Sequence, residues 1–180
     1  MVDLNTYIIE KLKINSNTVK QIYNYYPKNR RELKSLIKKL LEERGPDADL
    51  NDIDIRGVIN TAYLFMGLDP HNIDISKWDV SNVKTMDYMF YECVNFNCDL
   101  SGWDVSNVTD MSSMFYKCRN FNSDLSKWDV SNVTDIRGMF YRCKNFNSDL
   151  SKWNVSSVID TEDMFNNCTS LKNIPSWYKK

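Results

Sequence analysis

The chain has 180 residues and a formal net charge of −1, and charged residues make up 26% of it. Hydrophobic residues make up 42% and aromatic residues 13%, which excludes a disordered composition. The small net charge excludes an overall field that would select nucleic acid or a membrane surface, and the lack of any run of about 18 apolar residues excludes a membrane-spanning helix.

Charge is divided unevenly along the sequence. Residues 1–45 hold ten Lys or Arg and five Asp or Glu, a balance of +5, whereas residues 46–180 hold thirteen and nineteen, a balance of −6. The N-terminus "MVDLNTYIIEKLK" carries Asp3 and lacks the apolar core of a secretory signal, and no lipid-attachment motif is visible. We therefore expect a cytoplasmic protein, with the cell surface or a virion as alternative locations.

Residues 1–46 are predicted to form a helical head. The stretch "PKNRRELKSLIKKLLEERGP" predicts a helix over 29–44, with Asn29 as its N-cap, Glu32 in capping-box spacing, and Gly45 and Pro46 ending it. Its apolar stripe consists of Leu33, Leu36, Ile37, Leu40 and Leu41, and weaker helical periodicity comes earlier, at Leu4, Tyr7, Ile8 and Leu12. We predict that the 29–44 helix caps the first repeat of the body, and a partner-binding or oligomerising helix is the alternative.

The body, residues 47–180, is built from copies of one segment. Residues 100–124 and 125–149 agree at 19 of 25 positions. Fixed steps of 25 residues relate several columns, namely Trp78, Trp103, Trp128 and Trp153; Val83, Val108, Val133 and Val158; Phe90, Phe115, Phe140 and Phe165; Cys93, Cys118, Cys143 and Cys168. We divide the body into a degenerate repeat at 50–74, repeats at 75–99, 100–124, 125–149 and 150–173, and an exit strand at 174–180.

Within one copy the apolar period changes. Trp103 and Val105 alternate as in a strand, whereas Met111, Met114, Phe115 and Cys118 are spaced as on one face of a short helix. A single copy cannot bury such a face, but stacked copies can. The sequence therefore predicts an α/β repeat solenoid, with a leucine-rich-repeat-like parallel sheet on one side, short helices on the other, and the helical cap in front. We expect the indole N–H groups to bond to polar columns such as Ser106, Asn107 and Asn132.

The pattern "DLSxWDVSNVTDMxxMFYxCxNFN" resembles the BspA-like variety of leucine-rich repeat, which occurs in bacterial surface proteins and in proteins of phages, large viruses and protists. The resemblance covers about residues 48–177. It implies a solenoid with strands on one side, and recognition rather than catalysis. The N-terminal stretch "TYIIEKLKI" faintly resembles segments of large-phage proteins, which favours an intracellular target.

The residues that could carry chemistry are better explained by structure. The cysteine column lies beside Met and Phe on the apolar stripe, so we expect packed thiols rather than a zinc site, which prefers closely spaced pairs. His71 is the single histidine, so it cannot supply a relay at more than one place. The aspartate columns recur without an unlike partner for glycoside cleavage. We therefore expect a non-enzymatic protein with no cofactor and no metal.

Two surfaces are candidates for binding. The first is the predicted strand face, whose variable residues are Lys77, Asp79, Gly102, Asp104, Lys127, Asp129, Lys152 and Asn154. A rigid face lowers the ordering cost of binding a protein partner, so protein–protein recognition is the favoured function, in a phage- or virus-type effector or inhibitor of a host protein. The second is a basic patch beside Tyr91, Tyr116 and Tyr141 that could hold nucleic acid, formed by Lys117, Arg119, Arg137, Arg142 and Lys144. A fragment of a surface adhesin is a third possibility.

Overall fold

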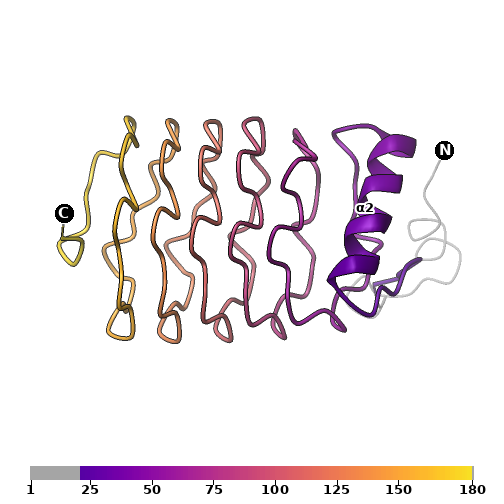
Figure 1. Cartoon of the computed structure of the whole chain (residues 1–180), viewed down its shortest axis with the longest axis horizontal. Coiled ribbons are helices and arrows are strands. Elements are labelled where there is room, and N and C mark those ends of the chain that lie inside the picture. The colour runs from indigo at the N-terminus through magenta and orange to yellow at the C-terminus, as the bar shows by residue number, and fades with distance from the viewer. Residues whose placement is uncertain (1–20, 180) are drawn as a thin grey trace, which may run out of the picture.

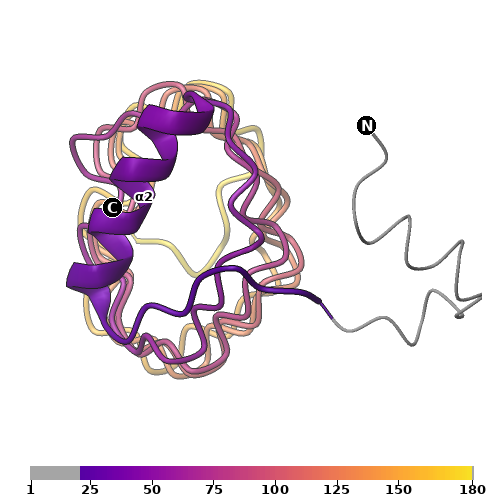
Figure 2. The ribbon, with the colours of Figure 1, turned by 90° about the vertical axis from the view of Figure 1, so that its right-hand side faces the viewer.

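A computed structural model describes residues 21–179. The chain winds as successive coils that lie side by side along the long axis of the molecule (Figure 1). Seen along that axis, the coils superimpose as a ring, and α2 (Arg30–Arg44) lies across one side of it (Figure 2). Parallel bridges of single residues join each coil to the next, from Asn60 to Thr85, Asp110, Asp135 and Asp160, a step of 25 residues each time. The sequence period is therefore the length of one coil.

The predicted α/β solenoid of the leucine-rich-repeat type is wrong. Residues 21–179 contain one helix, α2, and no strand longer than a bridge, so there is neither a parallel sheet nor a wall of short helices. The segment around Trp103 and Val105 that we expected as a strand is a succession of turns, closed by bonds from Trp103 N to Leu100 O and from Val108 N to Val105 O. Trp103 and Val105 are nevertheless buried, because tight turns also bring alternate side chains to one side.

The predicted short helices are replaced by a segment that we call the arc: residues 61–67 and their equivalents 86–92, 111–117, 136–142 and 161–167. Two positions of the arc are left-handed, with φ between 52° and 60° for Tyr88, Glu92, Ser113 and Lys117. Left-handed residues break an α-helix. Alternate N–H groups then leave the coil and bond to the next one, as from Met86 N to Asp110 O. The i, i+3, i+4 spacing of buried apolar residues is therefore present, but it arises from successive turns and not from a helix.

The core fills the inside of every coil. The Leu, Trp, Val, Met, Phe and Cys columns are almost fully buried and form one continuous cluster. Phenylalanines stack along the axis, with ring centroids 5.5 Å apart for Phe90 and Phe115 and 5.7 Å for Phe115 and Phe140. Offset stacking of this kind adds about 0.5–1.5 kcal/mol per pair to the free energy from area burial.

Two side-chain columns lock neighbouring coils together. Each indole donates to a backbone carbonyl of the preceding coil, as Trp103 Nε1 does to Ile75 O (3.1 Å) and Trp128 Nε1 to Leu100 O (3.0 Å). The expected indole acceptors Ser106, Asn107 and Asn132 are therefore wrong. The thiol of Cys143 likewise lies 2.8 Å from Phe115 O. These bonds give the buried indole N–H and thiol groups an acceptor, and a buried indole N–H without one would cost about 1–3 kcal/mol.

The helix α2 agrees with its prediction. Asn29 Oδ1 accepts from Glu32 N (3.0 Å), Glu32 Oε2 accepts from Lys28 N (2.9 Å), and Gly45 ends the helix with φ of 88°. Leu33, Ile37 and Leu40 are fully buried in the common core, so α2 covers the first coil. The earlier helical periodicity at Leu4, Tyr7, Ile8 and Leu12 lies outside the described residues.

Polar groups of α2 also reach the first coil. Arg30 Nη1 donates to Ala62 O (3.1 Å), and Lys34 Nζ donates to Tyr63 O (2.6 Å) and Met66 O (3.1 Å). In later coils, the carbonyls equivalent to those of Ala62 and Met66 accept N–H groups from the preceding arc. Burial and then the neighbouring Arg30 lower the pKa of Lys34. The two cations thus take the place of a preceding coil.

The left-handed positions give the first testable prediction. Gly138 has φ of 57°, and an added Cβ would lie 3.3 Å from Ser113 Oγ, whereas a Cβ at Gly102 meets nothing within 4 Å and Gly102 does not have a positive φ. We expect Gly138→Ala to lower the free energy of unfolding by about 1–2 kcal/mol and Gly102→Ala to leave it unchanged or slightly higher. Urea unfolding of both variants measures this, and equal effects would contradict the left-handed assignment.

The cap gives the second prediction. Replacing Lys34 with Met keeps the aliphatic stem but leaves two carbonyls without their donor. We expect a loss of about 1 kcal/mol of unfolding free energy, measured by urea denaturation. Lys38 is exposed on the same helix and makes no side-chain hydrogen bond or ion pair within residues 21–179, so Lys38→Met is the matched control. A loss as large in the control would show that the effect belongs to helix charge and not to the capped carbonyls.

Candidate functional site

An unbroken row of tyrosines runs along the outside of the stack. We call it the tyrosine ladder. Consecutive rings lie 4.6–5.4 Å apart between centroids, and all but one pair are stacked within 7° of parallel. Its members, in the order of their contacts, are Tyr63, Tyr88, Tyr91, Tyr116 and Tyr141. Tyr63 is 40% exposed and the others are half-buried, so each ring is held by its neighbours and still presents an edge to solvent.

The arc explains why these tyrosines face outward. Tyr63 and Tyr88 occupy the first left-handed position, and Tyr116 directly precedes the second, at Lys117. Met114 and Phe115, next to them in sequence, point into the core and are fully buried. Where the ladder passes Ser113 and Gly138, the small side chains leave an open hollow of about 280 Å³ with Tyr88 and Tyr116 among its walls.

Cations lie over the ladder. Lys117 Nζ is 5.4 Å from the centroid of the Tyr116 ring and 2.5 Å from Glu92 Oε1, and Arg142 lies 5.3 Å from the Tyr141 ring. Burial, and then the charge of Glu92, raise the pKa of Tyr91, and burial likewise raises the pKa of Tyr63. The phenols of Tyr63 and Tyr91 therefore remain protonated at neutral pH, and a protonated hydroxyl is able to donate a hydrogen bond to a partner.

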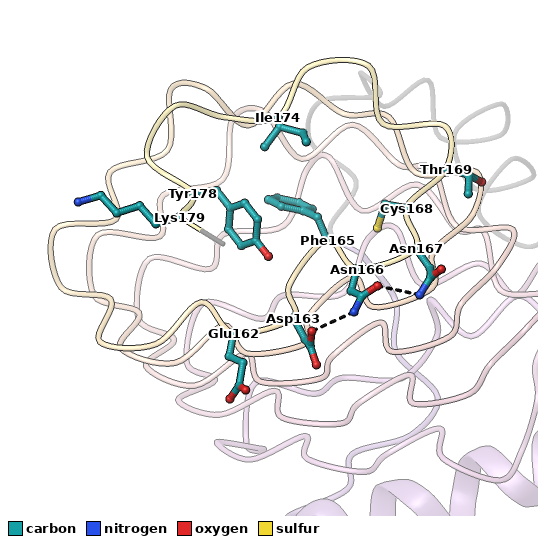
Figure 3. Close-up of a pocket in the computed structure, with 10 residues that line it drawn as sticks. All are labelled: Glu162, Asp163, Phe165, Asn166, Asn167, Cys168, Thr169, Ile174, Tyr178 and Lys179. Atoms are coloured by element: carbon teal, nitrogen blue, oxygen red, sulfur yellow. Dashed lines mark hydrogen bonds between the residues drawn. The ribbon is translucent and has the colours of Figure 1, made fainter.

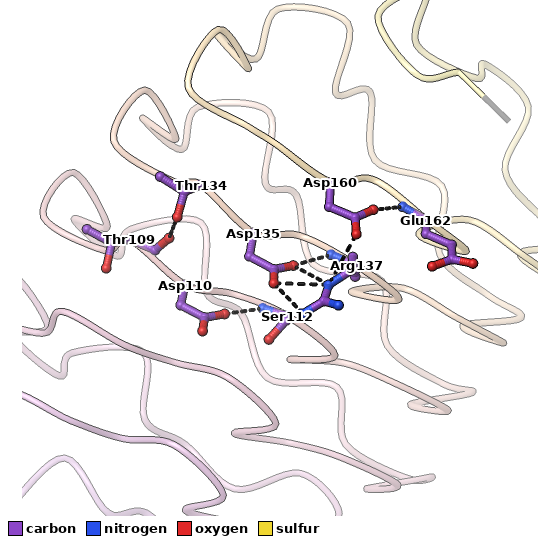
Figure 4. Close-up of polar contacts among 8 residues, drawn as sticks. All are labelled: Thr109, Asp110, Ser112, Thr134, Asp135, Arg137, Asp160 and Glu162. Carbon is purple, nitrogen blue, oxygen red and sulfur yellow. Dashed lines mark hydrogen bonds and ion pairs between the residues drawn. The ribbon is translucent and has the colours of Figure 1, made fainter.

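Beside the ladder runs a row of hydroxyl and carboxylate side chains (Figure 4). Asp110 accepts the N–H of Ser112 (2.9 Å), and Asp135 takes the same position and pairs with Arg137 (2.7 Å). Arg137 also lies 3.5 Å from Asp160 in the next coil. The row is therefore tied together both within coils and between them.

Away from the α2 end, where Arg30, Arg31 and Lys34 lie near Tyr63, the charges on this face are predominantly negative. The arc and the bridged column carry three cations, Lys117, Arg137 and Arg142. The carboxylates of the same columns number seven, namely Asp87, Glu92, Asp110, Asp135, Asp160, Glu162 and Asp163. An aromatic surface with excess carboxylate repels a phosphate backbone and attracts a basic protein surface.

The first predicted surface is not a strand face. All eight of its residues are exposed, but they stand in turns, and the carboxylates are already used: Asp79, Asp104 and Asp129 each accept the backbone N–H two residues later, as Asn154 does. The lysines of this row, Lys77, Lys127 and Lys152, form no ion pair within residues 21–179. A binding role for Lys77, Asp79, Gly102, Asp104, Lys127, Asp129, Lys152 and Asn154 stays a prediction.

The predicted basic patch is divided. Lys117, Arg137 and Arg142 lie at the tyrosine ladder, and the first two are neutralised by Glu92 and by Asp135 with Asp160. Arg119 and Lys144 occupy an exposed column of their own, where Arg119 O accepts from Asn145 N. The structure therefore brings tyrosines and cations together as the sequence indicated, but the carboxylates between them were missed, as were Tyr63 and Tyr88.

The cysteine column is structural. All five thiols are free; four are buried and Cys168 is partly buried. Burial raises the pKa of Cys93 and Cys168 to about 12 and that of Cys98 to about 11, and the fully buried Cys118 and the almost fully buried Cys143 are raised well above the usual value. These thiols stay protonated and are poor nucleophiles. Among residues 21–179, no three His, Cys, Asp or Glu side chains are placed to hold a metal ion, and His71 is exposed.

The family described as "Mycoplasma protein of unknown function, DUF285" matches residues 34–132 and 98–180, which together span 34–180. The chain belongs to this family. It is the family of the BspA-like surface repeat proteins, which agrees with the resemblance in its coarse form, while the leucine-rich-repeat geometry and the phage-type interpretation receive no support. Comparison with the curated proteins and with the solved structures found no significant match. In the described part of the chain, no helix is long and apolar enough to cross a membrane.

The turn carboxylates give a prediction about pH. Hydrogen bonds from the hydroxyl and then the backbone N–H of Ser106 lower the pKa of Asp104, and Ser131 does the same for Asp129. Because the folded-state pKa lies below the unfolded value of about 3.9, these groups stabilise the fold above that pH, and the contribution is lost as pH falls through the folded pKa.

We therefore expect the melting temperature of the native protein to fall steeply below about pH 4. In the double variant Asp104→Asn, Asp129→Asn, the amide oxygens keep the turn bonds, as Asn154 does from Ser156 N (3.2 Å). Its melting temperature should match the native protein near neutral pH and fall less on acidification. Parallel acid profiles of the two proteins would contradict the assignment to this column.

Proposed function

We propose that the chain is a non-enzymatic protein-recognition module and that the tyrosine ladder is its contact surface. The single observation that carries this proposal is the continuous contact of the five rings, which fixes large amphipathic side chains before any partner arrives. Tyrosine gives much contact area for little loss of conformational freedom, and it is enriched at the centres of protein interfaces. Rings that are already stacked lose even less conformational entropy on binding.

The charge pattern supports a partner with a basic surface. Three cations against seven carboxylates leave the face negative, and the hollow beside Tyr88 and Tyr116 is lined by Glu162 and Asp163 as well as by Arg137. An arginine side chain from a partner could stack on a phenol ring and pair with a carboxylate at once. The same balance speaks against nucleic acid, because bound phosphates need unpaired cations.

The structural role of the other reactive residues supports a non-enzymatic function. The buried thiols stay protonated, and the aspartates of the turn columns act as acceptors for neighbouring N–H groups. What remains exposed is a repeated set of like groups, whereas general acid–base catalysis needs two groups with different pKa values at one point.

The test compares two double variants for capture of partners from the native cell. Tyr116→Ala with Tyr141→Ala removes the last two rungs, and Lys127→Ala with Lys152→Ala alters the predicted turn row while leaving the ladder intact. We expect the first to weaken binding of the captured, purified protein roughly 30–1,000-fold, since two tyrosines at about 1–2 kcal/mol each contribute about 2–4 kcal/mol, and the second to bind as the native chain does.

Three results would overturn the proposal. Equal binding by the ladder variant and the native protein would exclude the ladder. Loss in the lysine variant alone would return the site to the turn row. Capture dominated by RNA or DNA, and weakening steeply with salt, would favour the nucleic-acid alternative. Melting temperatures of both variants close to that of the native chain are the control for folding.

A further inference from the structure

The hydrogen bonds of the arc all point in one direction. Met86, Tyr88, Phe90 and Glu92 donate their N–H groups to the coil that follows, at Asp110, Ser112, Met114 and Tyr116, over 2.8–2.9 Å. The same four bonds join the last two arcs, from Ile136, Gly138, Phe140 and Arg142. One edge of each arc therefore presents only N–H groups and the other only carbonyls, whereas a β-strand alternates the two along each edge.

The carbonyl edge of the first arc is closed. Arg30 and Lys34 of α2 donate to Ala62 O and Met66 O, which are the carbonyls equivalent to acceptors in later coils. Cations are the side chains suited to a row of carbonyls, whose partial charges are negative. Another chain could not bond to this edge without displacing α2, whose Leu33, Ile37 and Leu40 are fully buried.

The N–H edge of the last arc is open. The N–H groups of Thr161, Asp163 and Asn167 find no hydrogen-bond acceptor within residues 21–179, although their equivalents in all three preceding repeats are bonded. The N–H of Phe165 faces the Tyr178 hydroxyl, a contact that lowers the pKa of Tyr178 against the larger, opposite effect of burial. In front of this edge lies a cavity of about 510 Å³ (Figure 3).

The walls of the cavity show that it lies where a further coil would continue the stack. Residues 174–179 begin another coil, because Trp177 stacks on Trp153 at 6.4 Å and donates to Leu150 O as the other tryptophans do. Ile174 and Tyr178 line one side, and Phe165, Glu162 and Asp163 of the last arc line the other. In a complete coil, the next arc would supply carbonyls to the N–H groups of residues 161–167. The cavity lies where that arc would be.

The charge of the cavity walls and the direction of the hydrogen bonds at this edge restrict what can bind there. A second copy of this chain cannot complete the edge, since its carbonyl edge is covered by α2 and its own open edge offers further N–H groups. An inorganic anion would suit a row of N–H groups, but Glu162 and Asp163 stand beside this one. A polypeptide with backbone carbonyls and basic side chains meets both requirements.

We propose that the last arc is a docking edge for a basic polypeptide segment of about seven residues from a partner protein. The segment lies parallel to residues 161–167, its alternate carbonyls accept the free N–H groups of Thr161, Asp163 and Asn167, and its basic side chains lie near Glu162 and Asp163. This adds to the stack the next rung that each earlier arc already has, a form of recognition by edge augmentation. The edge shares Glu162 and Asp163 with the hollow beside the ladder, but its N–H donors belong to no tyrosine of the ladder.

The test uses the full chain, labelled with ¹⁵N, and a synthetic peptide with the sequence of residues 134–142, TDIRGMFYR, which supplies carbonyls in the required register and two arginines. We expect saturable NMR shift changes of the amides of Thr161, Asp163 and Asn167 at peptide concentrations below about 1 mM. The amides of residues 136, 138, 140 and 142, which are already bonded, should remain unchanged, and a scrambled peptide should give no saturable change.

Matched variants locate the binding. Ile174 is 54% exposed at the cavity, and Ile159 is 87% exposed in the same region of the chain but outside it. We expect Ile174→Lys to weaken peptide binding at least tenfold by repelling the basic peptide, and Ile159→Lys to leave it unchanged.

The proposal is overturned if the native chain shows no saturable change, if the scrambled peptide binds equally well, or if the changes fall on the tyrosine ladder instead. Peptide binding that survives Ile174→Lys would also exclude the cavity. Because the ladder variants and the edge variants are different residues, failure of this test leaves the proposed function of the ladder standing, and the reverse also holds.

Discussion

The structure depends on the directional hydrogen bonds between successive arcs. Each of the three middle arcs, 86–92, 111–117 and 136–142, gives four N–H groups to the coil that follows. This arrangement needs left-handed residues at two positions of every arc, among them Ser113 and Lys117. A residue in the right-handed region at either position would direct its N–H along its own coil, as in a helix, and the bond to the next coil would be lost. Left-handed geometry costs a non-glycine residue about 1–2 kcal/mol, and the bonds and buried columns that it permits offset that cost in every coil.

The same constraint decides which side chains face outward. A left-handed residue reverses the local turn, so Met114 and Phe115 enter the core while Tyr116 emerges from it. Identical backbone in successive coils then places identical side chains in register, and outward tyrosines must stack. The ladder therefore follows from the repetition of the same backbone and core in each coil. What individual coils add to it is variation, such as Ser113 and Gly138, which replace a tyrosine and open the hollow between rings.

The sequence predicted the repeat, the length of a coil, the buried columns and the helix α2, because each of these is written in spacing or in capping residues. It could not reveal that Met111, Met114, Phe115 and Cys118 lie on turns, since an i, i+3, i+4 pattern arises from any chain that returns every three to four residues. Non-glycine residues such as Tyr88 and Lys117 give no sign of a positive φ. The indole acceptors were also missed, because they are backbone carbonyls of the preceding coil, which leave no mark in side-chain identity.

The candidate site was only partly visible for a related reason. Tyr91, Tyr116 and Tyr141 were recognised beside the cations, but joining them to Tyr63 and Tyr88 needs the contact between Tyr88 and Tyr91, which lie in the same coil at different columns. The pairing of Lys117 with Glu92 crosses from one coil to the next at a step of 25 residues, so the repeat itself contains that signal. Comparing equal columns for opposite charge would have shown that the face is not basic.

A stack with directional bonds must have two unlike ends, and this chain treats them differently. The carbonyl end receives a helix with two cations, and its apolar stripe continues the core. At the N–H end, the indole column is continued by Trp177, whereas residues 21–179 hold no arc after 161–167. An end with unpaired donors costs free energy that the earlier coils do not incur. The capped end therefore fixes where the stack begins, and the open end is where added carbonyls would stabilise it most.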